Sequence, residues 1–420
     1  MVRLAAHPAE LIMPPWPDLT GRTGEHVAQW RRWLVQVWAQ EAIAATIEVA
    51  SPMLACRVGQ VCDGHEQRAH QVRRVVVSVV RYLLRATSRA TPFGLFAGVA
   101  PARFGPELQL RYGGEHGAVA RVDTEWLVGA ITRLERCAEL RRRLRVMANN
   151  LAFVRDGRLV VGCQRRSGGP SRTEPAEVSV RHTRAVETVI QAACLPICVA
   201  DLVGKLTAEF PETPESVVEG MLAELVEQGI LVSGLRPPMT VTDPLGHVVE
   251  ELAAVGADAV PQVAELFCEL RDIHRELSRH NRASSPTEWR ERRAAASARM
   301  AAIVTSERPV TVDLRVGCTL VLPQVVAREA ETAAAALTHL TPYPDGPLNW
   351  RDYHVRFLDR YGIGAFVPVS ELLNVEAGLG FPAGYRDSRR ELPAPRLSER
   401  DMRLFALAQT AAMNQSTEVV

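Results

Sequence analysis

The sequence predicts an α+β protein of several domains, in which many helices accompany small antiparallel sheets. First, its 420 residues are enough for two or three domains, each with a hydrophobic core. Second, long stretches such as residues 248–304 carry apolar side chains at helical spacing, with a break at Ser284-Ser285-Pro286. Third, short alternating runs such as Pro309–Val316 are typical of half-buried strands. A further helix is expected over residues 327–340.

Two helices are predicted near the N-terminus. Residues 25–45 place apolar side chains on one helical face, and we interpret its tryptophans as core rather than as a base-stacking platform. This face carries Trp30, Trp33, Leu34, Val37 and Trp38. The second helix covers residues 67–90, and its apolar side points toward a core. That side carries Val75, Val76, Val79, Leu83 and Leu84.

The second helix also carries a basic face. Arg81, Arg85 and Arg89 recur every four residues, so a helix places them in one row that ends at Thr91-Pro92-Phe93-Gly94. The segment between Glu66 and Glu107 contains no acidic residue, so these arginines have no partners nearby in sequence. Planar guanidiniums in a row suit a phosphate or carboxylate. A solvated basic face is the alternative, because Lys205 is the only lysine among the 49 basic residues.

The pattern of strands and helices over residues 149–236 predicts a separate module. Leu151–Val154 and Leu159–Val161 flank an Asp156-Gly157 pair that favours a tight hairpin turn, and Glu177–Arg181 reads as another strand. Three short helices and a strand-like exit complete a pattern typical of a winged helix-turn-helix. The helices are expected over 183–193, 199–209 and 214–228, and the exit over Gly229–Val232. The flanking domains would then cover residues 1–148 and 237–420.

A winged helix often binds DNA, but the charge of this one argues against that use. Residues 209–227 contain six glutamates and neither lysine nor arginine, so the third helix would repel phosphate. A peptide ligand that adds a strand to the sheet fits better. Val178, Ser179 and Val180 form the expected edge strand, although any of the three strands could serve.

Composition and motifs exclude several classes of function. The net charge of +1 argues against a general nucleic-acid coat, and no apolar run is long enough to span a bilayer. A secretory signal is absent, so we expect a cytoplasmic protein. The sequence lacks the phosphate-binding, dinucleotide, metalloprotease and hydrolase signatures, and its eight cysteines form no C-x-x-C pair. We therefore predict free thiols and no metal site. Asp123, just before Glu125-Trp126-Leu127, is expected to cap a helix.

The segment Arg85-x-x-x-Arg89-x-Thr91-Pro92-Phe93-Gly94 resembles the hallmark of lantibiotic (class I lanthipeptide) dehydratases, and more narrowly of their split thiopeptide-type relatives. Weaker similarities extend over the whole chain. They lie at Pro14-Pro15-Trp16-Pro17, Val122–Leu127, Val312-Asp313-Leu314, Trp350-x-x-Tyr353-x-x-x-Phe357-x-x-Arg360-Tyr361-Gly362 and Gly380-Phe381-Pro382-Ala383-Gly384-Tyr385.

The resemblance implies an activity. Such enzymes transfer glutamate from glutamyl-tRNA to Ser and Thr side chains of a precursor peptide, and a second activity then eliminates it. Glutamyl-tRNA would be a co-substrate, and no bound cofactor is implied. Matched to the family motif, Arg85, Arg89, Thr91, Asp123 and Asp313 would form the transfer site. Arg85 and Arg89 would also bind the tRNA, together with Arg81, which we add from its place on the helix. The leader segment of the peptide would bind at residues 178–180.

Three readings of the function remain open. Family members that carry out the transfer are longer than this chain, so we expect a fragment or one piece of a split enzyme, with elimination supplied by a separate protein or a missing chain portion. Related proteins instead join an amino acid from aminoacyl-tRNA to a peptide C-terminus. A non-catalytic leader-binding scaffold is the third reading. The sequence names neither the precursor peptide, nor the tRNA isoacceptor, nor the oligomeric state.

Overall fold

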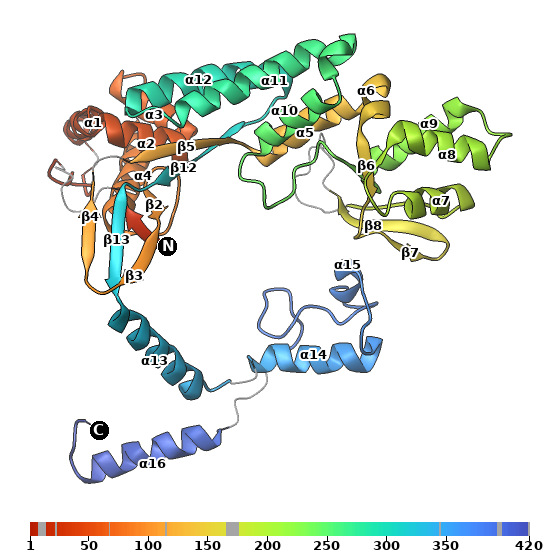
Figure 1. Ribbon diagram of the computed structural model, residues 1–420. Coiled ribbons are helices and arrows are strands. Elements are labelled where there is room, and N and C mark those ends of the chain that lie inside the picture. The colour runs from red at the N-terminus through yellow and green to blue at the C-terminus, as the bar shows by residue number, and fades with distance from the viewer. Residues whose placement is uncertain are drawn as a thin grey trace. The chain divides into compact units, whose positions relative to one another are not determined.

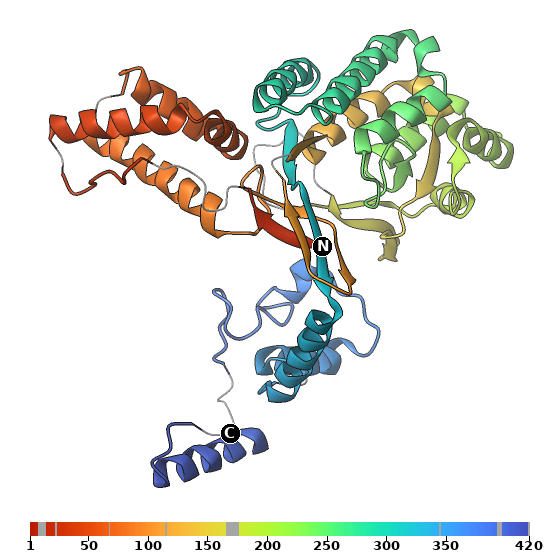
Figure 2. The ribbon, with the colours of Figure 1, turned by 60° about the vertical axis from the view of Figure 1, so that its left-hand side comes forward.

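A computed structural model describes residues 1–6, 14–21, 23–66, 68–113, 116–164, 176–343, 346–392 and 397–418 (Figures 1 and 2). The chain divides into two compact units. Unit 1 comprises Met1–Arg103 and Gln109–Val321, and unit 2 comprises Phe104–Leu108 and Leu322–Val420. Helices with small sheets confirm the predicted α+β class. In the described part of the chain, no helix is both long and apolar enough to cross a bilayer.

Four helices near the N-terminus pack around one core in unit 1. They are α1 (Gly24–Trp38), α2 (Glu41–Ala50), α3 (Pro52–Cys62) and α4 (Ala69–Ser88). Trp30 and Trp33 are buried in this core, as predicted. The single helix expected over residues 25–45 is wrong, because the backbone at Gln40 is extended (φ −83°, ψ 97°) and separates α1 from α2.

A four-stranded sheet joins distant parts of unit 1, in the order β1 (Val2–Ala5), β2 (Ala97–Ala100), β12 (Val310–Arg315) and β5 (Gly117–Val122). β12 runs antiparallel to β5 and parallel to β2. Glycine is needed at position 98, since a Cβ there would lie 2.0 Å from the carbonyl oxygen of Leu314. The predicted strand at 309–316 is therefore the central element that ties β2 to β5.

One face of this sheet packs against helices. Ala118, Ala120, Val312 and Leu314 contribute to a core with side chains of the neighbouring helices. Those helices are α5 (Thr124–Glu135), α10 (Pro244–Ala254), α11 (Pro261–His280) and α12 (Pro286–Ile303), with a short 3-10 turn, η1 (Ala257–Ala259), before α11. Because side chains alternate along strands, the opposite face carries the residues between the buried ones.

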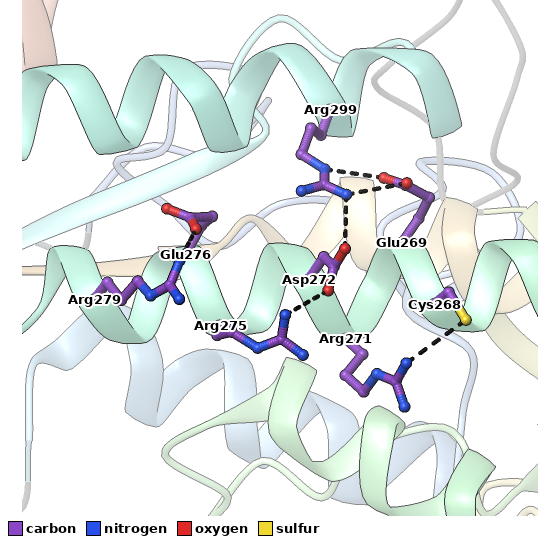
Figure 3. Close-up of polar contacts among 8 residues, drawn as sticks. All are labelled: Cys268, Glu269, Arg271, Asp272, Arg275, Glu276, Arg279 and Arg299. Carbon is purple, nitrogen blue, oxygen red and sulfur yellow. Dashed lines mark hydrogen bonds and ion pairs between the residues drawn. The ribbon is translucent and has the colours of Figure 1, made fainter.

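Ion pairs link α11 to α12 along their exposed sides (Figure 3). Arg299 of α12 donates to Glu269 and to Asp272 of α11, each at 3.0 Å. Asp272 in turn accepts from Arg275 at 2.8 Å. These contacts fix one helix against the other. The turn between them ends at Ser285, which caps α12, and Pro286 is the first residue of that helix, as the predicted break required.

The middle of the chain forms a further core within unit 1. The elements expected over 149–236 occur close to their predicted positions, and Asp156 (φ 50°) and Gly157 (φ 70°) form the expected hairpin turn. Assignment to the winged helix-turn-helix class stays a prediction. The elements are α6 (Ala138–Arg143), β6 (Arg145–Ala148), β7 (Phe153–Arg155), β8 (Arg158–Gln164), β9 (Ala176–Arg181), α7 (Arg184–Ala192), β10 (Ile197–Cys198), α8 (Val199–Glu209), α9 (Glu215–Glu227) and β11 (Leu231–Ser233).

Another sheet has the order β3 (Ala102–Gly105), β13 (Cys318–Pro323) and β4 (Gln109–Tyr112), and most of its residues belong to unit 1. The described part of unit 2 is mainly helical. It contains α13 (Gln324–Leu340), α14 (Leu348–Tyr361), α15 (Val369–Leu372) and α16 (Glu399–Met413). The first of these agrees with the helix predicted over 327–340.

Candidate functional site

The candidate site is built on the turn that follows α4. Phe93 N donates to the carbonyl oxygen of Ala97 at 3.1 Å, and Phe96 N donates to that of Phe93 at 3.0 Å. Gly94 adopts a φ of +52°, in the left-handed region that glycine enters without strain. The turn therefore reverses the chain from α4 directly into β2, and it holds Phe93 over the last turn of the helix.

Arg85 is the arginine that the turn positions. Its guanidinium lies 4.5 Å from the centre of the Phe93 ring, and its Nη2 donates to the carbonyl oxygen of Thr91 at 3.5 Å. Phe93 stacks on Phe96, and Phe96 on Tyr82, with ring centres 6.0 and 5.2 Å apart. Arg85 is half-buried, and its Nε is buried without a hydrogen-bond partner. The stack fixes a guanidinium whose hydrogen-bonding capacity is only partly used.

The prediction that one helix carries all three arginines is wrong for Arg89. α4 ends at Ser88, and Arg89 has an extended backbone (φ −120°, ψ 110°). Arg81 and Arg89 are exposed, as is Thr91. Among the described residues, no acidic side chain pairs with Arg81, Arg85 or Arg89, so the basic cluster keeps its charge uncompensated. Because the residue before a proline disfavours helical backbone, the helix could not continue through Thr91, and α4 has already ended at Ser88.

Asp313 lies on the open face of the four-stranded sheet. Asp313 of β12 pairs with Val119 of β5, and its carboxylate forms an ion pair with Arg121. The side chains of Arg121 and Asp313 are 48% and 51% exposed, so this pair faces solvent. Arg121 was not among the predicted site residues. Its only signal in the sequence is its position in an alternating run, two residues before Asp123.

Asp123 caps α5, as expected. Its Oδ1 accepts from Glu125 N at 2.8 Å, and its own N–H donates to the carbonyl oxygen of Pro309 at 2.7 Å. Strand alternation places Asp123 on the same face of the sheet as Arg121 and Asp313. In the described part of the chain, no hydrogen bond or ion pair joins these acids to Arg81, Arg85 or Arg89. The predicted site residues thus form two groups, one on the α4 turn and one on the sheet.

The predicted peptide site lies on β9, an edge strand of the sheet β7-β8-β9. Val178 is buried, whereas Ser179 and Val180 are partly exposed. Arg158 donates to Ser179 through its Nε to Oγ and its Nη2 to the carbonyl oxygen, both at 2.8 Å. β7 is the other edge of this sheet, so the central strand β8 is no longer a candidate for strand addition. Among the described residues, no cluster of His, Cys, Asp or Glu side chains is arranged to hold a metal ion.

The family model described as "Lantibiotic dehydratase, N terminus" matches residues 39–420. The subtilin biosynthesis protein SpaB of Bacillus subtilis is 28% identical over 321 residues, which are 75% of this chain and 29% of SpaB. The nisin biosynthesis protein NisB of Lactococcus lactis subsp. lactis is 21% identical over 328 residues, which are 76% of this chain and 31% of NisB. The chain thus spans about a third of the length of these curated relatives.

Solved structures show the same fold. The tRNA-dependent lantibiotic dehydratase MibB from Microbispora sp. 107891 matches with a TM-score of 0.72 and 33% identity, over 95% of this chain and 38% of MibB. The glutamylation domain of TbtB, from thiomuracin biosynthesis, matches with a TM-score of 0.56 and 18% identity, over 92% of this chain and 48% of the other. With the motif at Arg85–Gly94 and the family match over residues 39–420, this chain belongs to the lantibiotic dehydratase family, in the region described as its N terminus.

Proposed function

We propose that this chain takes part in tRNA-dependent glutamylation of Ser and Thr side chains in a ribosomal precursor peptide, the first step of dehydration in lanthipeptide or thiopeptide biosynthesis. The observation that carries the proposal is the fixed, uncompensated guanidinium of Arg85 at the Thr91–Gly94 turn, in a chain of the lantibiotic dehydratase family. MibB is described as tRNA-dependent and the TbtB domain as a glutamylation domain, which supports the same reaction here.

The charges of the two residue groups suit the two ends of such a reaction. Arg81, Arg85 and Arg89 offer guanidiniums for phosphates of the tRNA acceptor end. Asp313 and Arg121 offer a carboxylate and a guanidinium on the open face of the sheet. A glutamyl-tRNA analogue is the chemical class that such a site would bind, and a relative of this fold has been solved with 5'-phosphodesmethylglutamycin.

The reaction needs no energy-supplying cofactor. The hydroxyl oxygen of Ser or Thr attacks the carbonyl carbon of the glutamyl ester on the tRNA, and the bond from that carbon to the ribose oxygen breaks. The hydroxyl proton passes to the departing ribose oxygen. The reaction exchanges one ester for another, and the glutamyl ester of the tRNA is already an activated donor. Catalysis therefore depends on positioning and charge. Elimination of the glutamate would fall to a separate protein or to a further portion of the enzyme.

The leader segment of the peptide would add a strand to the edge of β9, at residues 178–180, and would replace the contact of Arg158 with the Ser179 carbonyl oxygen. Strand addition gives affinity through the main chain and holds the peptide near the transfer site. The acidic α9 makes DNA an unsuitable ligand for the same module.

The test is transfer of labelled glutamate from glutamyl-tRNA to a precursor peptide that contains Ser and Thr and carries its leader, with the elimination partner present or absent. Arg85→Ala should lower transfer at least a hundredfold, by about 3 kcal/mol at the charged contact. Arg85→Lys keeps the charge but loses the planar fork, and should also fail. Arg74→Ala is the matched control, because Arg74 is exposed on the same helix.

Four outcomes would oppose the proposal. Normal transfer by Arg85→Ala would remove Arg85 from the site. Label that resists hydroxylamine would indicate an amide and hence a peptide ligase, whereas a glutamyl ester on Ser or Thr is cleaved. Equal transfer to a precursor that lacks its leader would contradict the role of the β9 edge. A peptide that binds but never acquires label, even with the partner supplied, would indicate that the protein is a non-catalytic scaffold.

A further inference from the structure

Unit 2 contains a cavity of about 320 Å³ that the candidate site does not use. Four arginines line it: Arg356 and Arg360 from α14, and Arg389 and Arg390 from the segment after Tyr385. The cavity volume lies at the lower end of the range for small-molecule sites. All of its lining residues belong to unit 2, so its geometry does not depend on the rest of the chain.

The wall opposite α14 is a tightly fixed loop. Asn374 Oδ1 accepts from the N–H groups of Glu376 and Ala377 at 2.8 and 2.9 Å. A Cβ at Gly378 would lie 1.9 Å from the carbonyl oxygen of Glu371, so the loop needs glycine there. Tyr353 of α14 donates to the carbonyl oxygen of Gly380 at 2.7 Å. The two segments of weaker family resemblance, around Tyr353 and Gly380, therefore contact each other beside the cavity.

Two of the arginines are held in place by backbone. Arg356 Nη2 donates to the carbonyl oxygen of Leu379 at 3.1 Å, and Arg360 Nη2 donates to that of Ala377 at 2.9 Å. Arg356 Nη1 is buried without a hydrogen bond, and its nearest carboxylate, that of Asp352, is 4.0 Å away. These guanidiniums are thus oriented but retain donors that the protein leaves unused.

The charge inside the cavity is unbalanced. Arg389 and Arg390 are exposed, and within the described part of the chain their side chains form no ion pair or hydrogen bond. Glu376 and Asp387 also line the cavity, and both are exposed. Asp352 lies outside the lining but 4.0 Å from Arg356 Nη1, so four guanidiniums and three carboxylates leave a net positive charge. Positive charge around fixed forked donors suits the anionic oxygens of a phosphate group.

We propose that this cavity in unit 2 is a binding site for a phosphate group, held by Arg356, Arg360, Arg389 and Arg390. The phosphate comes either from the backbone of an RNA or from a small phosphorylated molecule. Arg356 and Arg360 orient the group through their fixed forks, and Arg389 and Arg390 supply charge at the mouth. Neither Arg85 nor Asp313 lines the cavity, so this proposal can be tested independently of the proposed transfer chemistry.

The first arm of the test measures binding of inorganic phosphate to the 420-residue protein by calorimetry, with chloride at matched ionic strength. Arg389→Gln/Arg390→Gln should weaken phosphate binding at least tenfold. Arg386→Gln is the matched control, because Arg386 is exposed in the same segment but does not line the cavity. Arg356→Lys should also weaken binding, since an ammonium cannot replace the fork. Circular dichroism checks that each variant is folded.

The second arm identifies the source of the phosphate. Labelled tRNA is titrated into the same variants, with and without inorganic phosphate as competitor. Weaker tRNA binding by the double variant alone assigns the site to RNA. Unchanged tRNA binding, with phosphate binding lost, assigns it to a small phosphorylated molecule. The proposal is overturned if neither ligand binds, or if Arg386→Gln weakens binding as much as the double variant does. Because Arg85→Lys leaves the cavity intact, failure at one site does not imply failure at the other.

Discussion

At position 94 the backbone has a φ of +52°, where an L-residue with a Cβ is strained by about 1–2 kcal/mol. The nearest atom to a Cβ built there is Cγ1 of Val49 at 3.4 Å, so the cost lies mainly in the backbone. The backbone of the turn that places Phe93 against Arg85 therefore favours glycine at position 94. Side-chain packing alone would not exclude a larger residue there.

We expect Gly94→Ala to lower the free energy of unfolding by about 1–2 kcal/mol in urea denaturation. Gly59→Ala is its control. Gly59 lies within α3 with open space where a Cβ would go, so alanine should stabilise the protein by about 0.5–1 kcal/mol. Equal effects of the two substitutions would show that the left-handed backbone at Gly94 is not needed for stability.

Between elements, a histidine–carboxylate pair connects α11 to the start of α10. His274 Nε2 lies 2.7 Å from Asp243 Oδ2, and Asp243 Oδ1 caps α10 by accepting from Gly246 N at 2.9 Å. The hydrogen bond with Asp243 raises the pKa of His274, and the charge of Glu250 acts in the same direction. The same hydrogen bond lowers the pKa of Asp243.

The signs of these shifts set a pH window. The pKa of His274 is raised in the folded state, so its contribution to stability is complete below its ordinary pKa of about 6.5 and is lost as the pH rises through the folded value. The pKa of Asp243 is lowered, so its contribution is complete above about 3.9 and is lost as the pH falls through the folded value. The pair is therefore most stabilising between about pH 4 and 6.5.

His274→Gln should accordingly lower the melting temperature more at about pH 5.5 than at about pH 8.5. His70→Gln is the control, because His70 is exposed on α4. Thermal unfolding at the two pH values measures the difference. A loss that is the same at both would mean that the pair acts by packing and hydrogen bonding without charge.

On the scale of the whole molecule, unit 1 contains three hydrophobic cores, and a buried polar contact connects two of them. Glu135, at the end of α5, is 6% exposed and accepts from Arg236 Nη2 at 2.8 Å and from Ser233 Oγ at 2.7 Å. Ser233 closes β11, and Leu231 at the start of that strand lies in the core of the middle module. This contact ties the module to the helices beneath the four-stranded sheet.

Glu135→Ala should destabilise unit 1 by about 3 kcal/mol, because it leaves a buried hydroxyl and a guanidinium without their acceptor. Glu139→Ala is the matched control: its carboxylate is 44% exposed and pairs with Arg143 on the helix surface, so the effect should stay within about 0.5 kcal/mol. Urea denaturation followed at several probes measures both. We expect the module and the rest of unit 1 to unfold at different urea concentrations in Glu135→Ala. A single transition at the same urea concentration as in the unsubstituted protein would contradict this role.

The sequence by itself determined those features that nearby residues encode. Asp156-Gly157 selects a hairpin turn, Pro286 and Ser285 start a helix, and Asp123 caps one, since each acts on backbone within a few residues. The family motif at Arg85–Gly94 is likewise local, and its resemblance was confirmed by the family match. Local signals failed where two helical stretches met without a strong breaker, at Gln40, and where the row of arginines ran past the helix end at Ser88.

Only the tertiary structure decided which distant residues meet. Arg121 and Asp313 pair across 192 positions because β12 inserts between β2 and β5, and strand register cannot be read from either strand alone. The arginine cavity of unit 2 arises because a helix and a loop close on each other through carbonyl oxygens of Leu379 and Ala377. Sequence periodicity carries no information about such backbone acceptors, so their partners become known only when the chain is folded.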